Sequence, residues 1–293
     1  QTWKGVEVQG TCNNINLCPK TSQYINPLTG TRGQGWLDCY WGAVIEKAST
    51  AAQLWGPTVN QSGGIISARG TTFLNNQTGI DFEPFRNFVP STNVTANYFA
   101  TIQGCTFKTT KEIPDFPGPD FISFVDMKQV KGATFWNCRF LNERKWKLAE
   151  NIGHYGWGIL AFSTNFTVTS CTFKGLGYGI QALKTGNFRN EPHVISGNDF
   201  YDCYIGTHTN FIQQGTIFGN RFYLGNVPDP DLVEKAIPGS NLAGQVGALY
   251  DYLINGFVCQ ENTFTKVDGN MPKTAGIVSF YLGSFNNVIS KNH

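Results

Sequence analysis

One short motif recurs along nearly the whole chain: an apolar residue, two variable residues, then Cys, Asn or Thr, one further residue, and Phe. Its seven complete copies end at Phe73, Phe107, Phe140, Phe173, Phe200, Phe222 and Phe264, and a stub at Ile289–His293 stops before its Phe. Successive Phe residues are separated by 22 to 42 positions. Repetition at a variable period above about 20 residues is typical of solenoids whose coils carry loops of different length.

The residue types indicate which kind of solenoid this is. Charged residues make up only 14% of the chain, while Phe, Gly, Asn and Thr are frequent, which favours strands and turns over helices. We therefore predict an all-β, right-handed, single-stranded parallel β-helix with long loop insertions, forming a single domain over residues 1–293. Gly79, Gly179 and Gly206 each follow a motif Phe by six residues. This spacing predicts that a coil contains a strand, a tight turn and a second strand opening with Gly.

In a parallel β-helix equivalent residues of successive coils stack at roughly 4.8 Å. The Phe residues are thus expected to form an aromatic stack in the interior. Two positions before the Phe, the residues change along the chain from Cys to Asn, and stacked Asn side chains hydrogen-bond one another in cross-β assemblies. The members of this column are Cys105, Cys138, Cys171, Asn198, Asn220, Asn262 and Asn292. We interpret its cysteines as inert buried thiols.

The remaining cysteines allow two further interpretations. Cys39 and Cys203 both lie in an Asp-Cys-Tyr segment, so we predict that they are equivalent and that residues 36–44 form the second half of an early coil. Cys12 and Cys18 flank a polar loop and are either a disulfide of an oxidising compartment or free thiols. No C-x-x-C pair occurs, so no zinc or dithiol site is expected.

Other classes of partner lack a signal in the sequence. No Lys/Arg run indicates a nucleic-acid partner, no apolar stretch reaches the 18 or so residues of a membrane span, and no pattern indicates a cofactor or metal. The chain opens at Gln1 in a strand-like segment and stops inside a repeat. We interpret it as a processed chain or a fragment whose β-helix ends are covered by flanking domains or a partner chain, because open strand edges promote aggregation.

Three segments carry a resemblance to a known family. They are Trp3-Lys-Gly-Val-Glu-Val-Gln-Gly10, the segment Asp38–Val44, and the coil from Gly64 through Phe73-Leu-Asn-Asn76 to Gly79-Ile80. The chain resembles the right-handed parallel β-helix region of large secreted proteins of Bacteroidetes-type bacteria, with Asp38-Cys-Tyr-Trp41 in place of the usual Asn-Ala element. The resemblance implies a secreted or cell-surface location and transit through type IX secretion machinery.

Right-handed β-helices include polysaccharide lyases and hydrolases, and glycoside hydrolysis requires two or three carboxylates on neighbouring strands. The polygalacturonase-type segments Asn-Thr-Asp, Asp-Asp, Gly-His-Gly and Arg-Ile-Lys are all absent. The residues that remain as catalytic candidates are His154, His208, Asp81 and Glu83. Each has an alternative interpretation as a polar residue of a strand surface or a turn.

Aromatic residues give a second functional signal, because exposed rings stack on sugars. The candidates for such a platform are Trp36, Trp41, Tyr155 and Trp157, with packing as the alternative. Three hypotheses follow. The first is a non-catalytic adhesin, glycan-binding or structural module that contacts a polysaccharide or cell-surface glycan. The second is a polysaccharide-degrading lyase or hydrolase with an atypical site. The third is a passive stalk or cargo segment of a secreted multidomain protein.

Overall fold

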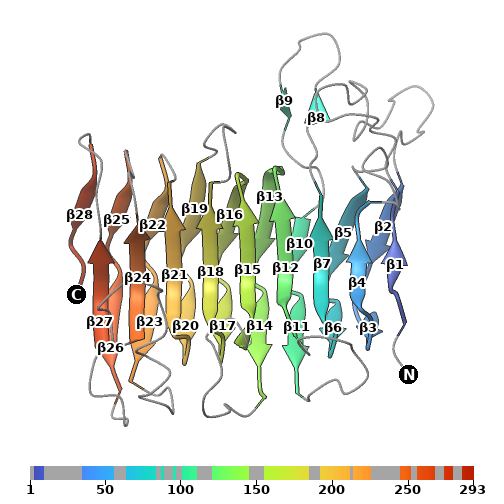
Figure 1. Cartoon of the computed structure of the whole chain (residues 1–293), viewed down its shortest axis with the longest axis horizontal. Coiled ribbons are helices and arrows are strands. Elements are labelled where there is room, and N and C mark those ends of the chain that lie inside the picture. The colour runs from blue at the N-terminus through green and yellow to red at the C-terminus, as the bar shows by residue number, and fades with distance from the viewer. Residues whose placement is uncertain are drawn as a thin grey trace.

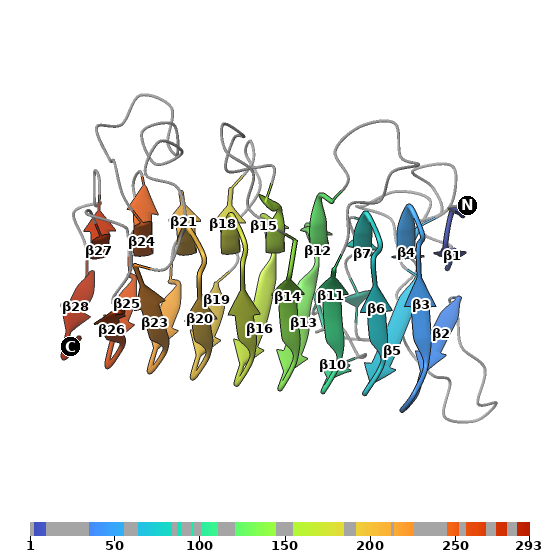
Figure 2. The same ribbon diagram turned by 90° about the horizontal axis from the view of Figure 1, so that it is seen from below.

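The chain folds as a right-handed parallel β-helix, as the repeat predicted (Figure 1). A computed structural model describes residues 3–9, 35–55, 64–83, 87–88, 95–96, 101–110, 121–144, 155–184, 192–211, 214–225, 245–251, 256–267, 274–279 and 286–293. These residues form mainly strands and turns, with no α-helix among them. Three parallel sheets run the length of the solenoid, and each coil passes through them in the order sheet I, sheet II, sheet III (Figure 2).

Sheet I contains the first strand of each coil. Its strands are β2 (Trp36–Cys39), β5 (Ile65–Arg69), β10 (Thr101–Gln103), β13 (Lys131–Trp136), β16 (Asn165–Thr169), β19 (His193–Ser196), β22 (Thr216–Phe218), β25 (Val258–Gln260) and β28 (Val288–Ser290). Sheet II carries the motif Phe. Its strands are β3 (Val44–Glu46), β6 (Thr72–Leu74), β11 (Thr106–Thr109), β14 (Arg139–Asn142), β17 (Thr172–Lys174), β20 (Asp199–Tyr201), β23 (Arg221–Leu224) and β26 (Thr263–Lys266).

Sheet III closes each coil. Its strands are β1 (Val6–Glu7), β4 (Thr50–Gln53), β7 (Thr78–Phe82), β12 (Ser123–Lys128), β15 (Trp157–Phe162), β18 (Tyr178–Leu183), β21 (Ile205–Asn210), β24 (Gln245–Asp251) and β27 (Thr274–Ser279). A small antiparallel pair, β8 (Asn87–Phe88) and β9 (Thr95–Ala96), lies between β7 and β10 along the chain. The sequence predicted two strands per coil, and this was wrong. Each complete coil has three strands, because the apolar residue and the Phe of the motif belong to different strands.

A sharp turn separates those two strands in every coil. From β5 onward, the residue after each sheet I strand has a positive φ of 52–62°, and these residues are Gly70, Gly104, Asn137, Ser170, Gly197, Gly219, Glu261 and Lys291. This left-handed conformation bends the chain sharply at one residue, and Gly and Asn adopt it at the lowest cost. The turn is what directs the apolar residue and the Phe into the same core from two different sheets.

The motif Phe residues form one continuous stack in the core. Neighbouring rings from Phe73 to Phe264 have centroids 4.6–4.9 Å apart and planes within 5–8° of parallel. The strand pairing is in register at every step, so the predicted aromatic stack is confirmed.

The glycines of sheet III are required by this stack. A Cβ built on Gly179 would lie 2.7 Å from Phe200 Cδ1 and 2.5 Å from the carbonyl oxygen of Gly206. Gly206 and Gly247 would meet the next Phe ring in the same way, at 2.6 Å. Gly179 and Gly206 are the second residues of their strands and Gly247 is the third, and each leaves the space that a Phe ring fills.

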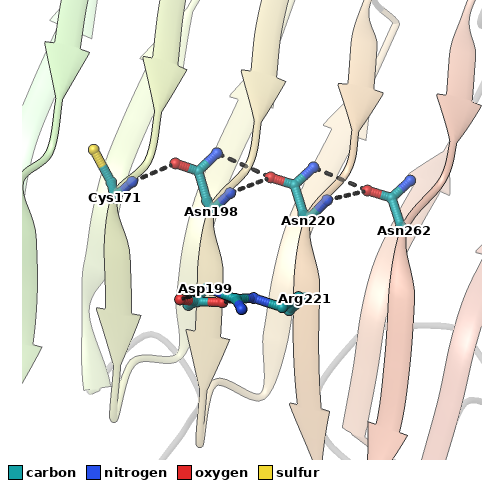
Figure 3. A network of polar contacts seen from close by, with 6 residues as sticks. All are labelled: Cys171, Asn198, Asp199, Asn220, Arg221 and Asn262. Carbon is teal, nitrogen blue, oxygen red and sulfur yellow. Dashed lines mark hydrogen bonds and ion pairs between the residues drawn. The ribbon is translucent and has the colours of Figure 1, made fainter.

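The predicted asparagine ladder is also present (Figure 3). Asn198 Nδ2 donates to Asn220 Oδ1 at 2.9 Å, and Asn220 Nδ2 donates to Asn262 Oδ1 at 2.9 Å. At the junction with the cysteines, the backbone N–H of Cys171 donates to Asn198 Oδ1 at 2.8 Å. Since these side chains are fully buried, each amide needs the partner that the next coil supplies.

The predicted equivalence of Cys39 and Cys203 is wrong. Cys39 pairs with Ala68 in sheet I, at the apolar core position of the motif, whereas Cys203 lies in the turn after β20. Residues 36–44 are therefore the beginning of a coil. The sequence pattern did not reveal this register. Ile45 lies six positions after Cys39, whereas in the other coils the sheet II core residue lies five positions after the sheet I core residue, as Phe73 does after Ala68. Cys12 and Cys18 lie outside the described residues.

Candidate functional site

The outer face of sheet III carries chemistry that the repeat does not require. Ile80, Val125 and Ile180 point into the core, so the residues that follow them point outward, because side chains alternate along a strand. Trp157 and Tyr178 precede Gly158 and Gly179, which face the Phe stack, so these two rings also point outward. All of these outward residues belong to neighbouring strands of one sheet. We call the following set the sheet III strip: Asp81, Glu83, Asp126, Lys128, Trp157, Tyr178, Gln181 and His208.

Carboxylates gather at the end of the strip formed by β7 and β12. Asp81 and Asp126 are direct partners on adjacent strands, roughly 4.8 Å apart along the helix axis. Asp81 Oδ2 accepts a hydrogen bond from Trp55 Nε1 at 2.8 Å, and Lys128 Nζ lies 2.7 Å from Glu83 Oε1. Asp81 and Asp126 are both partly buried, and the Oδ1 atom of each is buried without a hydrogen-bond partner.

This environment disfavours charge on the two aspartates. Burial raises the pKa of Asp81, although the hydrogen bond from Trp55 opposes the shift. Burial likewise raises the pKa of Asp126 to about 6, with the charges of Asp81 and Glu83 adding to the shift and that of Lys128 opposing it. A carboxyl group with a pKa near 6 can hold or release a proton under mildly acidic conditions.

Aromatic rings continue the strip over β15, β18 and β21. Trp157 stacks on Tyr178 with ring centroids 5.8 Å apart and planes 5° from parallel, and Tyr178 stacks on His208 at 6.0 Å. Trp157 and Tyr178 are partly exposed to solvent. The stack runs along the helix axis, because its members occupy successive strands.

A hydrogen-bond relay fixes the polar members of this stack. Trp157 Nε1 donates to Gln181 Oε1 at 2.7 Å, and the Gln181 amide nitrogen lies 2.8 Å from His208 Nδ1. Since the amide nitrogen is a donor, His208 Nδ1 accepts and the proton of the neutral ring is assigned to Nε2. Burial lowers the pKa of His208 to about 4, so the ring stays neutral near pH 7. Its buried Nε2–H has no partner.

The structure brings four of the predicted site residues onto one face: Asp81, Glu83, Trp157 and His208. Trp36 and Trp41 lie elsewhere, in β2 and in the turn that follows it. Trp36 Nε1 donates to Asp38 Oδ1 at 2.6 Å, and Trp41, with 75% of its surface exposed, covers the backbone of Gly70.

Tyr155 is a packing residue, since it is only 3% exposed and its ring lies 6.2 Å from that of Tyr204. Tyr155 precedes β15 and is not part of the outward stack of Trp157, Tyr178 and His208. His154 lies outside the described residues.

The sequence interpretation missed Asp126, Lys128 and Gln181. A periodic signal for the strip exists in the tetrapeptides Thr78-Gly-Ile-Asp81, Tyr178-Gly-Ile-Gln181 and Ile205-Gly-Thr-His208. In β12 the same tetrapeptide reads Ser123-Phe-Val-Asp126, with Phe in place of Gly. This Phe packs at a tilt against the rings of the core stack. Because it replaces the Gly of the tetrapeptide, the pattern does not identify Asp126.

No protein-family model, curated protein or solved structure matches this chain. Within the described ranges, no group of three or more His, Cys, Asp and Glu side chains is placed to hold a metal ion. The same residues include no helix with the length and apolar character needed to cross a membrane.

Proposed function

We propose that this protein is a secreted or cell-surface β-helix that binds a carbohydrate chain along the sheet III strip. The observation that carries the proposal is the stack of Trp157, Tyr178 and His208 along the solenoid axis, in which Gln181 links Trp157 to His208 by hydrogen bonds. Aromatic faces pack against the apolar faces of sugar rings, while carboxylates and amides hydrogen-bond to hydroxyl groups.

The dimensions of the strip favour an extended ligand. Four strand-to-strand steps separate β7 from β21, which corresponds to about 19 Å at the usual strand spacing. The carboxylates lie at one end of this length and the aromatic stack at the other. A polysaccharide lying along the axis would contact both. The resemblance to secreted Bacteroidetes-type β-helix regions supports a location where such chains are found.

A glycan array followed by calorimetric titration of the bound glycan tests this proposal. Trp157→Ala should weaken binding by about 2 kcal/mol, or roughly thirtyfold, because aromatic anchors carry a large share of binding energy. Trp136→Ala is the matched control, since Trp136 is 48% exposed on sheet I, away from the strip. A blank array together with a blank cell-surface binding assay would contradict the proposal and favour a passive stalk or cargo segment.

The paired carboxylates favour a second candidate function, cleavage of the bound polysaccharide. Asp81 and Asp126 are in register on adjacent strands, and the raised pKa of Asp126 suits a general acid that is protonated in mild acid. On this hypothesis Asp126 would protonate the glycosidic oxygen, and Asp81 would serve as the second carboxylate.

A single isosteric substitution at Asp126 distinguishes glycan binding from glycan cleavage. Asp126→Asn keeps the shape of the side chain but cannot exchange the proton, so it should abolish the release of reducing ends and leave glycan affinity within a few-fold of that of the unaltered protein. The measurement is a reducing-end assay between pH 4 and 8 on the glycans retained by the array. Equal cleavage by both proteins, or none by the unaltered protein, would rule out this candidate.

A further inference from the structure

The charges on the sheet III strip are strongly unequal. The strip has three carboxylates, Asp81, Glu83 and Asp126, against one ammonium group, that of Lys128, which gives a net charge of −2 when all four are ionised. Within strands β7, β12, β15, β18 and β21, Lys128 is the only Lys or Arg, and Lys184 directly follows β18.

The one cation is already paired. Lys128 Nζ lies 2.7 Å from Glu83 Oε1, and the charges of Asp81 and Asp126 also act on it. An anionic group of a ligand would therefore have to break this ion pair or lie beside an uncompensated carboxylate. Such repulsive contacts are a common source of discrimination between similar ligands.

The other end of the strip, formed by Trp157, Tyr178, Gln181 and His208, carries no positive charge. Burial keeps His208 neutral near pH 7, and its Nε2–H is itself buried, so this end of the strip presents no positive charge to a ligand. Aromatic rings are complementary to the apolar surface of sugars, and carboxylate acceptors are complementary to sugar hydroxyls. They provide no counter-charge for carboxylate or sulfate groups on a polysaccharide.

We infer that the strip selects uncharged polysaccharides and rejects polyanionic chains built on the same backbone. This inference rests on the proposed carbohydrate binding and adds the substrate class to it. The discrimination arises at the Asp81–Asp126 end of the strip, where an anionic substituent would meet like charge.

Two pairs of probes with matched backbones test the inference by titration at pH 7.5 and low salt. They are hydroxyethyl cellulose against carboxymethyl cellulose, and fully methyl-esterified pectin against de-esterified polygalacturonate. In a pair whose backbone binds, the uncharged member should bind roughly tenfold or more tightly than the anionic one. The difference should shrink in 0.5 M salt, because screening weakens the repulsion between partly exposed charges.

Two variants test whether the preference for uncharged polysaccharides arises at Asp81 and Asp126. The double variant Asp81→Asn/Asp126→Asn should bind the anionic member several-fold more tightly and reduce the preference. Asp199→Asn is the control, because Asp199 pairs with Arg221 on sheet II (Oδ2–Nη2 2.7 Å) and should leave the preference unchanged (Figure 3).

The possible failures are distinguishable. Equal or tighter binding of the anionic member would overturn the inference while leaving the proposed carbohydrate binding intact. The inference would also be overturned if the preference persisted undiminished in the double variant. Absence of binding to either member of both pairs, together with a blank glycan array, would overturn the proposed function and this inference with it.

Discussion

At the scale of single residues, His193 ties the stability of the core to pH. Its ring is fully buried against Phe166, with centroids 5.3 Å apart, and neither ring nitrogen has a hydrogen-bond partner. Burial lowers the pKa of His193 from 6.5 to about 4. The unfolded chain therefore binds the proton more readily than the folded chain. The contribution of neutral His193 to the free energy of unfolding is complete above pH 6.5 and is lost as the pH decreases toward 4. The loss from this residue should reach about 3 kcal/mol.

His193→Phe tests this at the same scale, because an aromatic ring already occupies the paired position at Phe166. Denaturant unfolding at pH 7.5 and pH 4.5 should show a smaller acid loss in the variant than in the unaltered protein. Part of the loss should remain, since the pKa of His208 is lowered for the same reason. Asp126, whose pKa is raised, acts in the opposite direction in both proteins. Identical acid losses would show that His193 is not buried in its neutral form.

At the scale of the strand, the glycines of sheet III determine how closely the Phe stack approaches the sheet. Gly179→Ala places a methyl group 2.7 Å from the Phe200 ring and 2.5 Å from a backbone oxygen, so it should lower the free energy of unfolding by about 3 kcal/mol. Gly219→Ala is the contrast, since its φ is +62° but nothing lies within 4 Å of the new methyl, and the left-handed conformation alone should cost about 1 kcal/mol. Urea denaturation of both variants measures the difference, and a larger loss at Gly219 would contradict the steric role assigned to Gly179.

At the scale of the whole molecule, each coil contacts mainly its two neighbours through register-matched strands. Stability in such a solenoid is close to a sum of coil and interface terms, so the terminal coils open more easily than the middle ones. Hydrogen exchange followed by mass spectrometry should therefore give the slowest exchange in β14–β20 and progressively faster exchange toward β1 and β28. Uniform exchange across all strands would instead indicate that the solenoid opens in a single cooperative step.

The sequence by itself determined the solenoid, the Phe stack and the asparagine ladder. The physical reason is that stacked coils require the same side chain at the same core position in every coil, so the core repeats visibly along the chain. Cys39 shows the limit of this logic, because one additional residue between two core positions was enough to obscure the register.

Only the tertiary structure decided which outward residues meet. Asp81 and Asp126 are 45 residues apart, and they become neighbours because the coil between them closes through sheets I and II regardless of the length of its loops. Outward positions are free to vary from coil to coil, since no stacking constraint acts on them. Their residue types therefore differ from coil to coil. The Gly-containing tetrapeptides mark some of these positions in the sequence, but the grouping of Asp81, Glu83, Trp157 and His208 on one face follows from the register of sheet III.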